Sequence, residues 1–157
     1  MKAATVTQIK RELEHCSTEE LTELCLRLAK FKQENKELLT YLLFEADDET
    51  TYIEAVKAEV DAQFEQINAS SYYYIRKSVR KILRLIKKFA RYSSKKETEV
   101  EFLLHFCYKL RTLQPSIYNN ITLTNTYNRQ MDLIKTMVYA LHEDLQYDYG
   151  LKIEKLG

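Results

Sequence analysis

Glycine and proline are almost absent from this chain, which contains two glycines and one proline among its 157 residues. The hairpins and tight turns of β-sheet proteins use these residues repeatedly, because glycine reaches positive φ angles and proline pre-sets a turn. Phosphate-binding loops also depend on glycine. The scarcity of both residues therefore predicts an all-α protein and argues against β-rich folds and glycine-rich nucleotide loops.

Composition narrows the class of protein further. Hydrophobic residues make up 45% of the chain and charged residues 30%, which is typical of a globular protein. No apolar run approaches the roughly 20 residues of a membrane span, and the first residues lack the apolar core of a signal peptide. Three cysteines without a CxxC spacing (Cys16, Cys25 and Cys107) indicate reduced thiols. We expect a cytoplasmic protein without membrane insertion, folded as a single helical domain over residues 1–157.

Apolar residues recur at spacings of three and four along most of the chain, as they do on one face of an α-helix. This periodicity predicts six to seven antiparallel helices, arranged as stacked helical hairpins or as an irregular bundle. We expect the helices at about residues 5–15, 17–31, 36–44, 48–67, 72–92, 95–113 and 125–146.

Helix starts are predicted from capping residues. Ser17 followed by Glu20 forms a capping box, in which the hydroxyl accepts from the amide of residue 20 and the carboxylate reaches back. Asp47 or Asp48 can cap the helix that follows, and acidic residues there suit the positive end of its dipole.

The later boundaries depend on a few single residues. Ser93 or Ser94 is the expected cap of the helix after the basic one, and Pro115 should end that helix. The chain from about residue 147 is expected to form a tail. There Gly150 could end a helix, and residues 151–156 could pack back as a short extended piece.

The stretch Tyr72–Lys96 contains ten lysine and arginine residues and no acid. Its apolar residues are spaced as on one side of a helix, which places the positive charge on the other side. This basic helix is the candidate surface for an anion or a partner. Its candidate residues are Arg76, Arg80, Arg84, Lys87, Lys88, Arg91, Lys95 and Lys96.

Several interpretations of the basic helix remain open. It could contact the phosphates of a nucleic acid, it could lie on an anionic membrane surface, or it could dock an acidic protein. The simplest alternative needs no partner, because residues 45–71 contain one base and eight acids. A hairpin could place the acids of this segment near the first bases of the next one. These are Glu54, Glu59, Asp61 and Glu65, beside Arg76, Lys77, Arg80 and Lys87. That pairing is the expectation we favour, and it would leave the far end, Lys88 to Lys96, as the free part.

Catalytic and metal-binding signatures are weak. Glu12 and His15 form one ExxH pair, whereas a di-iron bundle needs two such pairs and two further glutamates. Cys16 lies beside His15, but adjacency in sequence does not make a thiolate–imidazole pair. No HExxH, GxSxG or Walker motif is present. We therefore predict a protein that is not an enzyme and that needs no cofactor or metal, with a thiol or metal enzyme at His15 and Cys16 as a minor alternative.

Twelve tyrosines are unusual in a chain of this length. Tyr72, Tyr73 and Tyr74 span most of a helical turn, so at least one of them must leave the core side. Tyrosine suits interfaces because its body is apolar and its tip is polar. The leading interpretation is a non-enzymatic interaction or scaffold protein that self-associates or binds a protein partner. The alternative is binding of nucleic acid or another polyanion through residues 72–96.

The segment from Glu12 to Phe44 resembles the N-terminal part of a family of small uncharacterised all-helical bacterial proteins. The shared pattern is a short helix, then Ser-x-x-Glu-Leu opening the next helix, then Asn-Lys-Glu-Leu-Leu opening a third. The resemblance implies a bacterial, cytosolic protein and supplies no activity, cofactor or catalytic residue.

Overall fold

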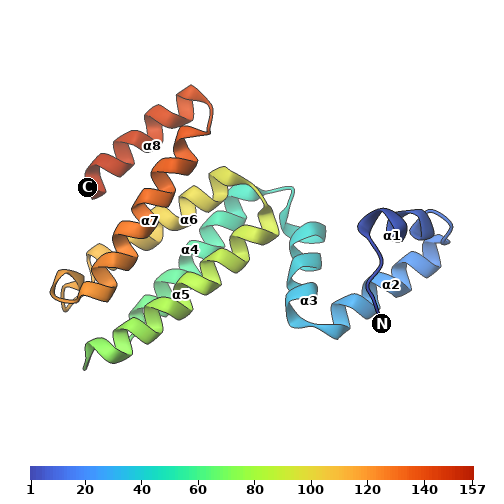
Figure 1. Ribbon diagram of the computed structural model, residues 1–157, viewed down its shortest axis with the longest axis horizontal. Helices are drawn as coiled ribbons and strands as arrows, with labels where there is room; N and C mark the ends of the chain where they lie inside the picture. The colour runs from blue at the N-terminus through green and yellow to red at the C-terminus, as the bar shows by residue number, and fades with distance from the viewer. The chain divides into compact units, whose positions relative to one another are not determined.

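The computed structural model describes residues 1–157 and contains eight α-helices and no strand (Figure 1). The all-α prediction is confirmed, with eight helices where six to seven were expected. Contacts divide the chain into two compact units, Met1–Phe44 and Glu45–Gly157, and each is described by itself. The single helical domain over residues 1–157 stays a prediction. None of the helices combines the length and the apolar character that crossing a bilayer requires.

The first unit consists of α1 (Val6–Leu13), α2 (Thr18–Phe31) and α3 (Gln33–Thr40), and a π-helical turn (Tyr41–Glu45) follows α3. The predicted capping box of α2 is confirmed, because Ser17 accepts from the amide of Glu20 at 3.1 Å. Lys32 is extended and separates α2 from α3, so α3 begins earlier than expected.

Burial is almost absent from this first unit. Among its 44 residues only Ala29 and Tyr41 are buried. The apolar side of α2 includes Leu24 and Leu28, which are 43% and 61% exposed. The helical periodicity was correct, and the inference that its apolar side lies in a core was wrong for this unit.

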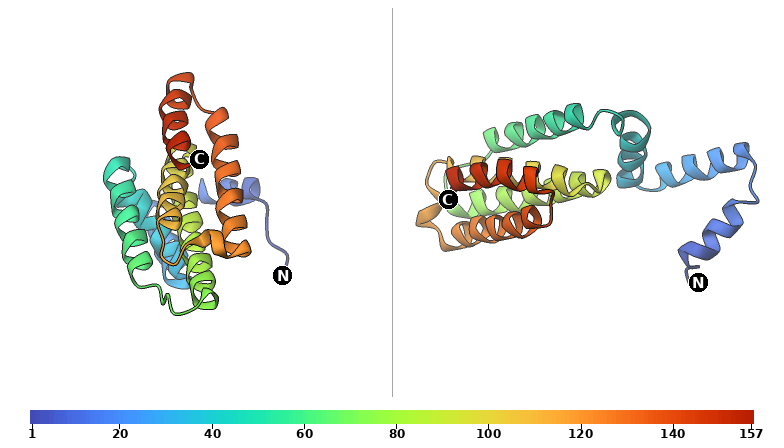
Figure 2. Two further views of the ribbon diagram at one scale, coloured as in Figure 1. Left: turned by 90° about the vertical axis from the view of Figure 1, so that its left-hand side faces the viewer. Right: turned by 90° about the horizontal axis from the view of Figure 1, so that it is seen from above.

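In the second unit, α6 is the central helix. It contacts each of the four other helices of the unit, which Figure 2 shows around it. The five helices are α4 (Glu49–Glu65), α5 (Tyr72–Ser93), α6 (Lys96–Arg111), α7 (Ile121–Tyr139) and α8 (Glu143–Leu156).

The core of the second unit is built on α6 because that helix is apolar on several sides. Its Phe102 and Phe106 are fully enclosed, and both meet aromatic rings of α4. The ring of Phe102 lies 6.1 Å from that of Tyr52, and the ring of Phe106 lies 5.9 Å from that of Phe64. Edge and tilted arrangements of this kind are favourable for aromatic pairs.

The boundary between α5 and α6 corrects one sequence prediction. Ser94 adopts a left-handed conformation (φ 58°) and ends α5, and Lys95 precedes the first residue of α6. Neither Ser93 nor Ser94 caps α6. The hydroxyl of Ser93 instead donates to the carboxylate of Glu49, which also accepts from Thr98 at 2.6 Å. A tertiary hydrogen bond has replaced the expected local cap.

The C-terminal segment is a helix, which corrects the expected extended tail. Asn120 caps α7 four residues earlier than predicted, and α7 ends at Tyr139 instead of continuing to residue 146. Gly150 lies within α8 and does not end a helix. The new helix is held by burial of Tyr149 and Leu156, whose carbonyl accepts from the Tyr127 hydroxyl at 2.7 Å.

Candidate functional site

The two sides of α5 differ completely in environment. Its apolar side is buried in the second unit, with Ile75, Val79, Ile82, Ile86 and Ala90 all at most 4% exposed. At 100° per residue, the side chains opposite this stripe must face solvent, and nearly all of them are basic. The amphipathic pattern of the sequence is therefore realised as a helix packed on one side and charged on the other.

We call the six exposed cations on the solvent side of α5 the basic face. They recur at spacings of three and four residues, and with a rise of about 1.5 Å per residue they extend over roughly 21 Å of helix. No acidic residue occurs anywhere in α5. The basic face consists of Lys77, Arg80, Lys81, Arg84, Lys87 and Arg91.

The acids of α4 do not neutralise the basic face. The pairs that we favoured for Glu54, Asp61 and Glu65 are not formed, and Glu49 pairs with Lys95 beyond the end of α5 instead. Asp61 turns to α6, where its carboxylate lies 2.6 Å from His105 and 3.5 Å from Lys109. The single base of α4, Lys57, pairs with Glu101 of α6 at 3.0 Å. No side chain of the basic face forms an ion pair. The helices α4 and α5 pack through their apolar sides, so the charges of α4 from Glu54 onward face α6 or solvent.

The far end that we expected to be free, Lys88 to Lys96, is free only in part, because Lys88 and Lys95 have neighbours whereas Arg91 and Lys96 form no ion pair. Lys95 lies 3.5 Å from Glu49, and the ammonium of Lys88 lies 5.3 Å from the ring centre of Phe89. Lys96 is exposed at the first turn of α6, and Arg76 is half-buried at the flank of the basic face. The free positive charge therefore runs along α5 from Lys77 to Arg91 and is not confined to its C-terminal end.

The three consecutive tyrosines at the start of α5 separate into two groups. Tyr73 and Tyr74 are 59% and 46% exposed, and their rings meet edge-on with centres 5.3 Å apart. They precede Lys77 by four and three residues, which places them on the same side of the helix as the basic face. Tyr72 is half-buried, and its hydroxyl donates to the carbonyl of Ser116 at 2.7 Å. Tyr72 is held by packing, whereas the other two rings are accessible.

Sequence reasoning left Lys77 and Lys81 out of the candidate set, although both belong to the basic face. A usable signal existed, because both lie three or four residues from Arg80 or Arg84. The candidate residues Arg80, Arg84, Lys87 and Arg91 are brought together as expected.

A second charged cluster lies between α4, α6 and α8, around an open pocket of about 310 Å³. Its centre is Glu101, which accepts from Lys57 at 3.0 Å, from the Tyr149 hydroxyl at 2.8 Å and from Lys152 at 3.3 Å. Burial alone would raise the pKa of Glu101, but the bonds from Lys57 and Tyr149 and the charges of both lysines lower it below its ordinary value. The carboxylate of Glu101 already accepts hydrogen bonds from three side chains of α4 and α8. The cluster therefore connects these two helices to α6.

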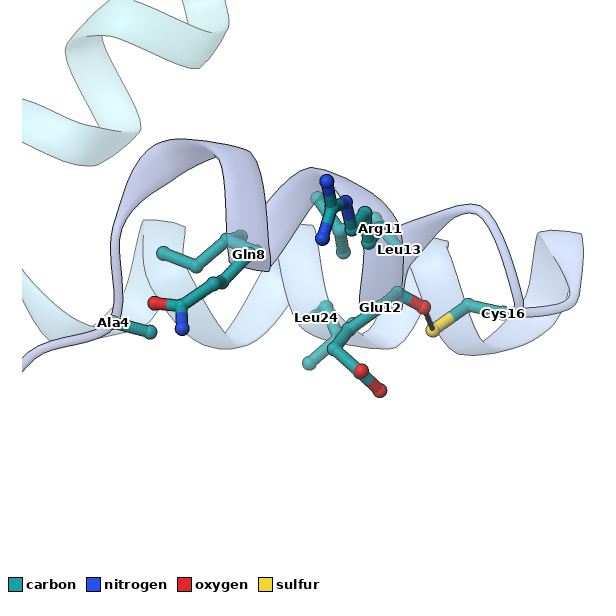
Figure 3. A pocket seen from close by; sticks show the side chains of 8 residues that line it. Ala4, Gln8, Arg11, Glu12, Leu13, Cys16 and Leu24 are labelled. Carbon is teal, nitrogen blue, oxygen red and sulfur yellow. Dashed lines mark hydrogen bonds between the residues drawn. The ribbon is translucent and has the colours of Figure 1, made fainter.

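The remaining candidates lie near α1. Cys16 donates to the carbonyl of Glu12 at 3.5 Å and lines an open pocket between α1 and α2, drawn in Figure 3. No three histidine, cysteine or acidic side chains gather in a group that could hold a metal ion. Burial raises the pKa of the Cys107 thiol to about 12, which suits an inert packing residue.

Comparisons of the chain with protein families, with curated proteins and with solved structures gave no match. The resemblance of residues 12–44 to small helical bacterial proteins therefore stays a prediction.

Proposed function

We propose that this protein binds nucleic acid through the basic face of α5, as a non-enzymatic interaction protein. The single observation that supports the proposal is a row of six exposed cations without an acidic partner. Each lysine or arginine that neutralises a phosphate releases a condensed counterion, which is the main source of nonspecific affinity for nucleic acids.

Nucleic acid is favoured over an anionic membrane because of what lies on the other side of α5. A helix that lies on a membrane inserts its apolar side between the lipids. Here that side is occupied, with Ile75 and Ile86 fully enclosed in the core of the second unit.

Tyr73 and Tyr74 favour nucleic acid over an acidic protein, and unpaired strands over duplexes. Exposed aromatic rings beside a charged groove or face can stack on bases, and bases are accessible for stacking only where they are unpaired. Both rings continue the basic face at its N-terminal end. The expected ligand is therefore a single-stranded DNA or RNA that runs along α5.

The proposal is tested by fluorescence anisotropy with labelled single-stranded DNA and RNA at several salt concentrations. Neutralisation of four to six phosphates predicts a slope of log K against log[salt] of about −3 to −4, given roughly −0.7 per phosphate of a single strand. The double variant Arg80→Ala/Arg84→Ala should weaken binding at least tenfold and make the slope shallower by about 1.4. Lys135→Ala is the matched control, because Lys135 is exposed on α7 and forms no ion pair. Equal binding by all three proteins, or no binding at low salt, would refute the proposal.

The stacking part is tested separately with Tyr73→Ala. Base–aromatic stacking contributes about 1–3 kcal/mol per base. The variant should therefore lose about fivefold or more of its affinity for a single strand and keep the salt slope. Its affinity for a duplex of the same sequence should not change. A loss that is equal for both ligands would contradict stacking and leave only phosphate contacts.

A further inference from the structure

The first unit presents a continuous apolar surface that nothing within the unit covers. The helices α1 and α2 contribute large apolar side chains at spacings of three and four, and α3 and the π-helical turn contribute Leu38 and Leu42. All of them are at least 36% exposed. On α2 they form one stripe along the whole helix. We call this surface the apolar face of residues 1–44, and it consists of Val6, Ile9, Leu13, Leu21, Leu24, Leu28, Phe31, Leu38 and Leu42.

Two open grooves run along this apolar face, one on each flank of α2. The first, of about 470 Å³, lies between α1 and α2 and is lined by Ile9, Leu13 and Leu24 among others (Figure 3). The second, of about 190 Å³, lies between α2 and α3 and includes Leu28 and Leu38. Leu24 and Leu28 are successive positions of the α2 stripe, so they connect the two grooves into one surface.

The helices of this unit are locally well specified although they lack a core. Thr5 and Ser17 both form complete capping boxes, and the side-chain amide of Asn35 donates to the carbonyl of Leu28 at 2.8 Å across the break. Chains of about 40 residues bury too little surface to be stable alone and usually need a partner or a cross-link. Since only two of its residues are buried, the stability of this unit depends on contact with another surface.

We infer that the apolar face of residues 1–44 is covered by the same face of a second copy of this chain, so that the protein forms a two-fold symmetric dimer. The first argument is area. Nine half-exposed side chains of this size present on the order of 800 Å², which matches the roughly 800 Å² that each partner contributes to a standard stable interface. It also exceeds the roughly 300–600 Å² of the largest apolar patch on a typical monomer.

The second argument is charge. Residues 1–44 contain seven bases and seven acids, so two copies meet without net repulsion. A symmetric contact requires a self-complementary surface, and an apolar stripe on a neutral helical unit satisfies that requirement. Two helical hairpins that pack through such stripes form the arrangement of a helix bundle.

The third argument is the lack of a matching surface elsewhere in the chain. Residues 45–157 enclose a complete core, and their exposed large apolar side chains are spread over different elements. Examples are Tyr108 on α6, Ile121 and Tyr139 on the two ends of α7, and Tyr147 on α8. None of these elements shows an exposed apolar stripe comparable to that of α2.

Sedimentation velocity of the full chain over a concentration series tests this dimer. The wild type should change from monomer to dimer as its concentration rises. The variant Leu24→Lys/Leu28→Lys places four charges in the symmetric interface and should shift the midpoint of dimerisation at least a hundredfold. Tyr139→Lys is the control, because Tyr139 is 84% exposed at the end of α7 and should leave the midpoint unchanged. A wild type that stays monomeric, or an equal effect of both variants, would overturn the inference.

Alkylation of Cys25 supplies a second measurement that needs no disruptive variant. Cys25 is exposed and lines the groove between α2 and α3, whereas Cys107 is buried. In a Cys16→Ser background, the rate of Cys25 alkylation should fall at least fivefold between concentrations below and above the dimerisation midpoint. A rate that is slow at every concentration would show that the face is covered within one chain, and a rate that is fast at every concentration would show that it stays open. Either result would overturn the inference.

Discussion

Both units of this chain are mainly helical, yet only residues 45–157 enclose a core. In both units amphipathic helices begin at well-formed caps, for example at Ser17 in α2 and at Asn120 in α7. In the second unit the apolar sides meet around α6, whereas in the first unit they stay exposed. The periodicity of a helix therefore specifies which of its sides is apolar. Burial of that side also requires enough neighbouring helices to cover it.

The largest difference between the units is expected when a leucine of each is truncated and the free energy of unfolding is measured. Leu103→Ala, at a position that is 0% exposed in α6, should lower the free energy of unfolding by about 2–5 kcal/mol, because it leaves a cavity in the core. Leu26→Ala, at a 49% exposed position of α2 outside the apolar face, should cost less than about 0.5 kcal/mol. Urea unfolding of both variants measures the contrast. Similar costs would show that the two units are equally packed.

Removal of a half-buried carboxylate from the second unit should change how the free energy of unfolding depends on pH, whereas removal of an exposed one from the first unit should not. Because the pKa of Glu101 is lowered on folding, its contribution is complete above its ordinary pKa of 4.5 and is lost as the pH falls through the folded value. Glu101→Gln should cost about 1.5–3 kcal/mol near neutral pH, and the cost should shrink as the pH falls below 4.5. Unfolding curves between pH 3 and 7 check this. Glu34→Gln is the control in the first unit, since its pair with Lys32 is exposed and should contribute at most about 1 kcal/mol.

Loss of a helix cap should destabilise the whole second unit but only one helix of the first unit. Asn120→Ala should lower the global free energy of unfolding by about 1 kcal/mol, because α7 is part of the cooperative core. Ser17→Ala should instead loosen α2 locally and raise hydrogen exchange of its amides about fivefold, while the exchange of α6 stays the same. If Ser17→Ala also speeds exchange in α6, the two units unfold together.

Removal of a side chain from the basic face should have the smallest effect on stability, because these side chains are exposed. Arg84→Ala should change the free energy of unfolding by less than about 0.5 kcal/mol, because its side chain forms no ion pair. Asp61→Asn should cost more, about 1 kcal/mol, since Asp61 contacts both His105 and Lys109. Thermal unfolding checks both variants. A large cost for Arg84→Ala would indicate that the basic face serves the fold rather than a ligand.

Much of the fold could be predicted from the sequence because it depends on neighbours along the chain. The helical content, the capping box at Ser17 and the cap at Asp48 all depend on contacts between residues three or four apart. The errors are at positions where distant groups compete. The hydroxyl of Ser93 bonds to Glu49 instead of capping α6, and the burial of Tyr149 and Leu156 makes the tail helical.

The candidate site was predicted in part. The position of Arg80, Arg84, Lys87 and Arg91 on one side of α5 follows from spacing alone. Whether the acids of α4 reach them does not, because rotation of α4 about its axis is decided by packing of its apolar side chains. That rotation turns Asp61 toward α6.

By itself the sequence determined the all-helical class, the charged side of α5 and the apolar sides of α1 to α3, since these depend on local geometry and on the 3.6-residue period of the helix. Only the tertiary structure decided which apolar sides are buried and which charges are paired. Burial and pairing require groups far apart in the chain to meet, and the period of a single helix contains no information about its neighbours.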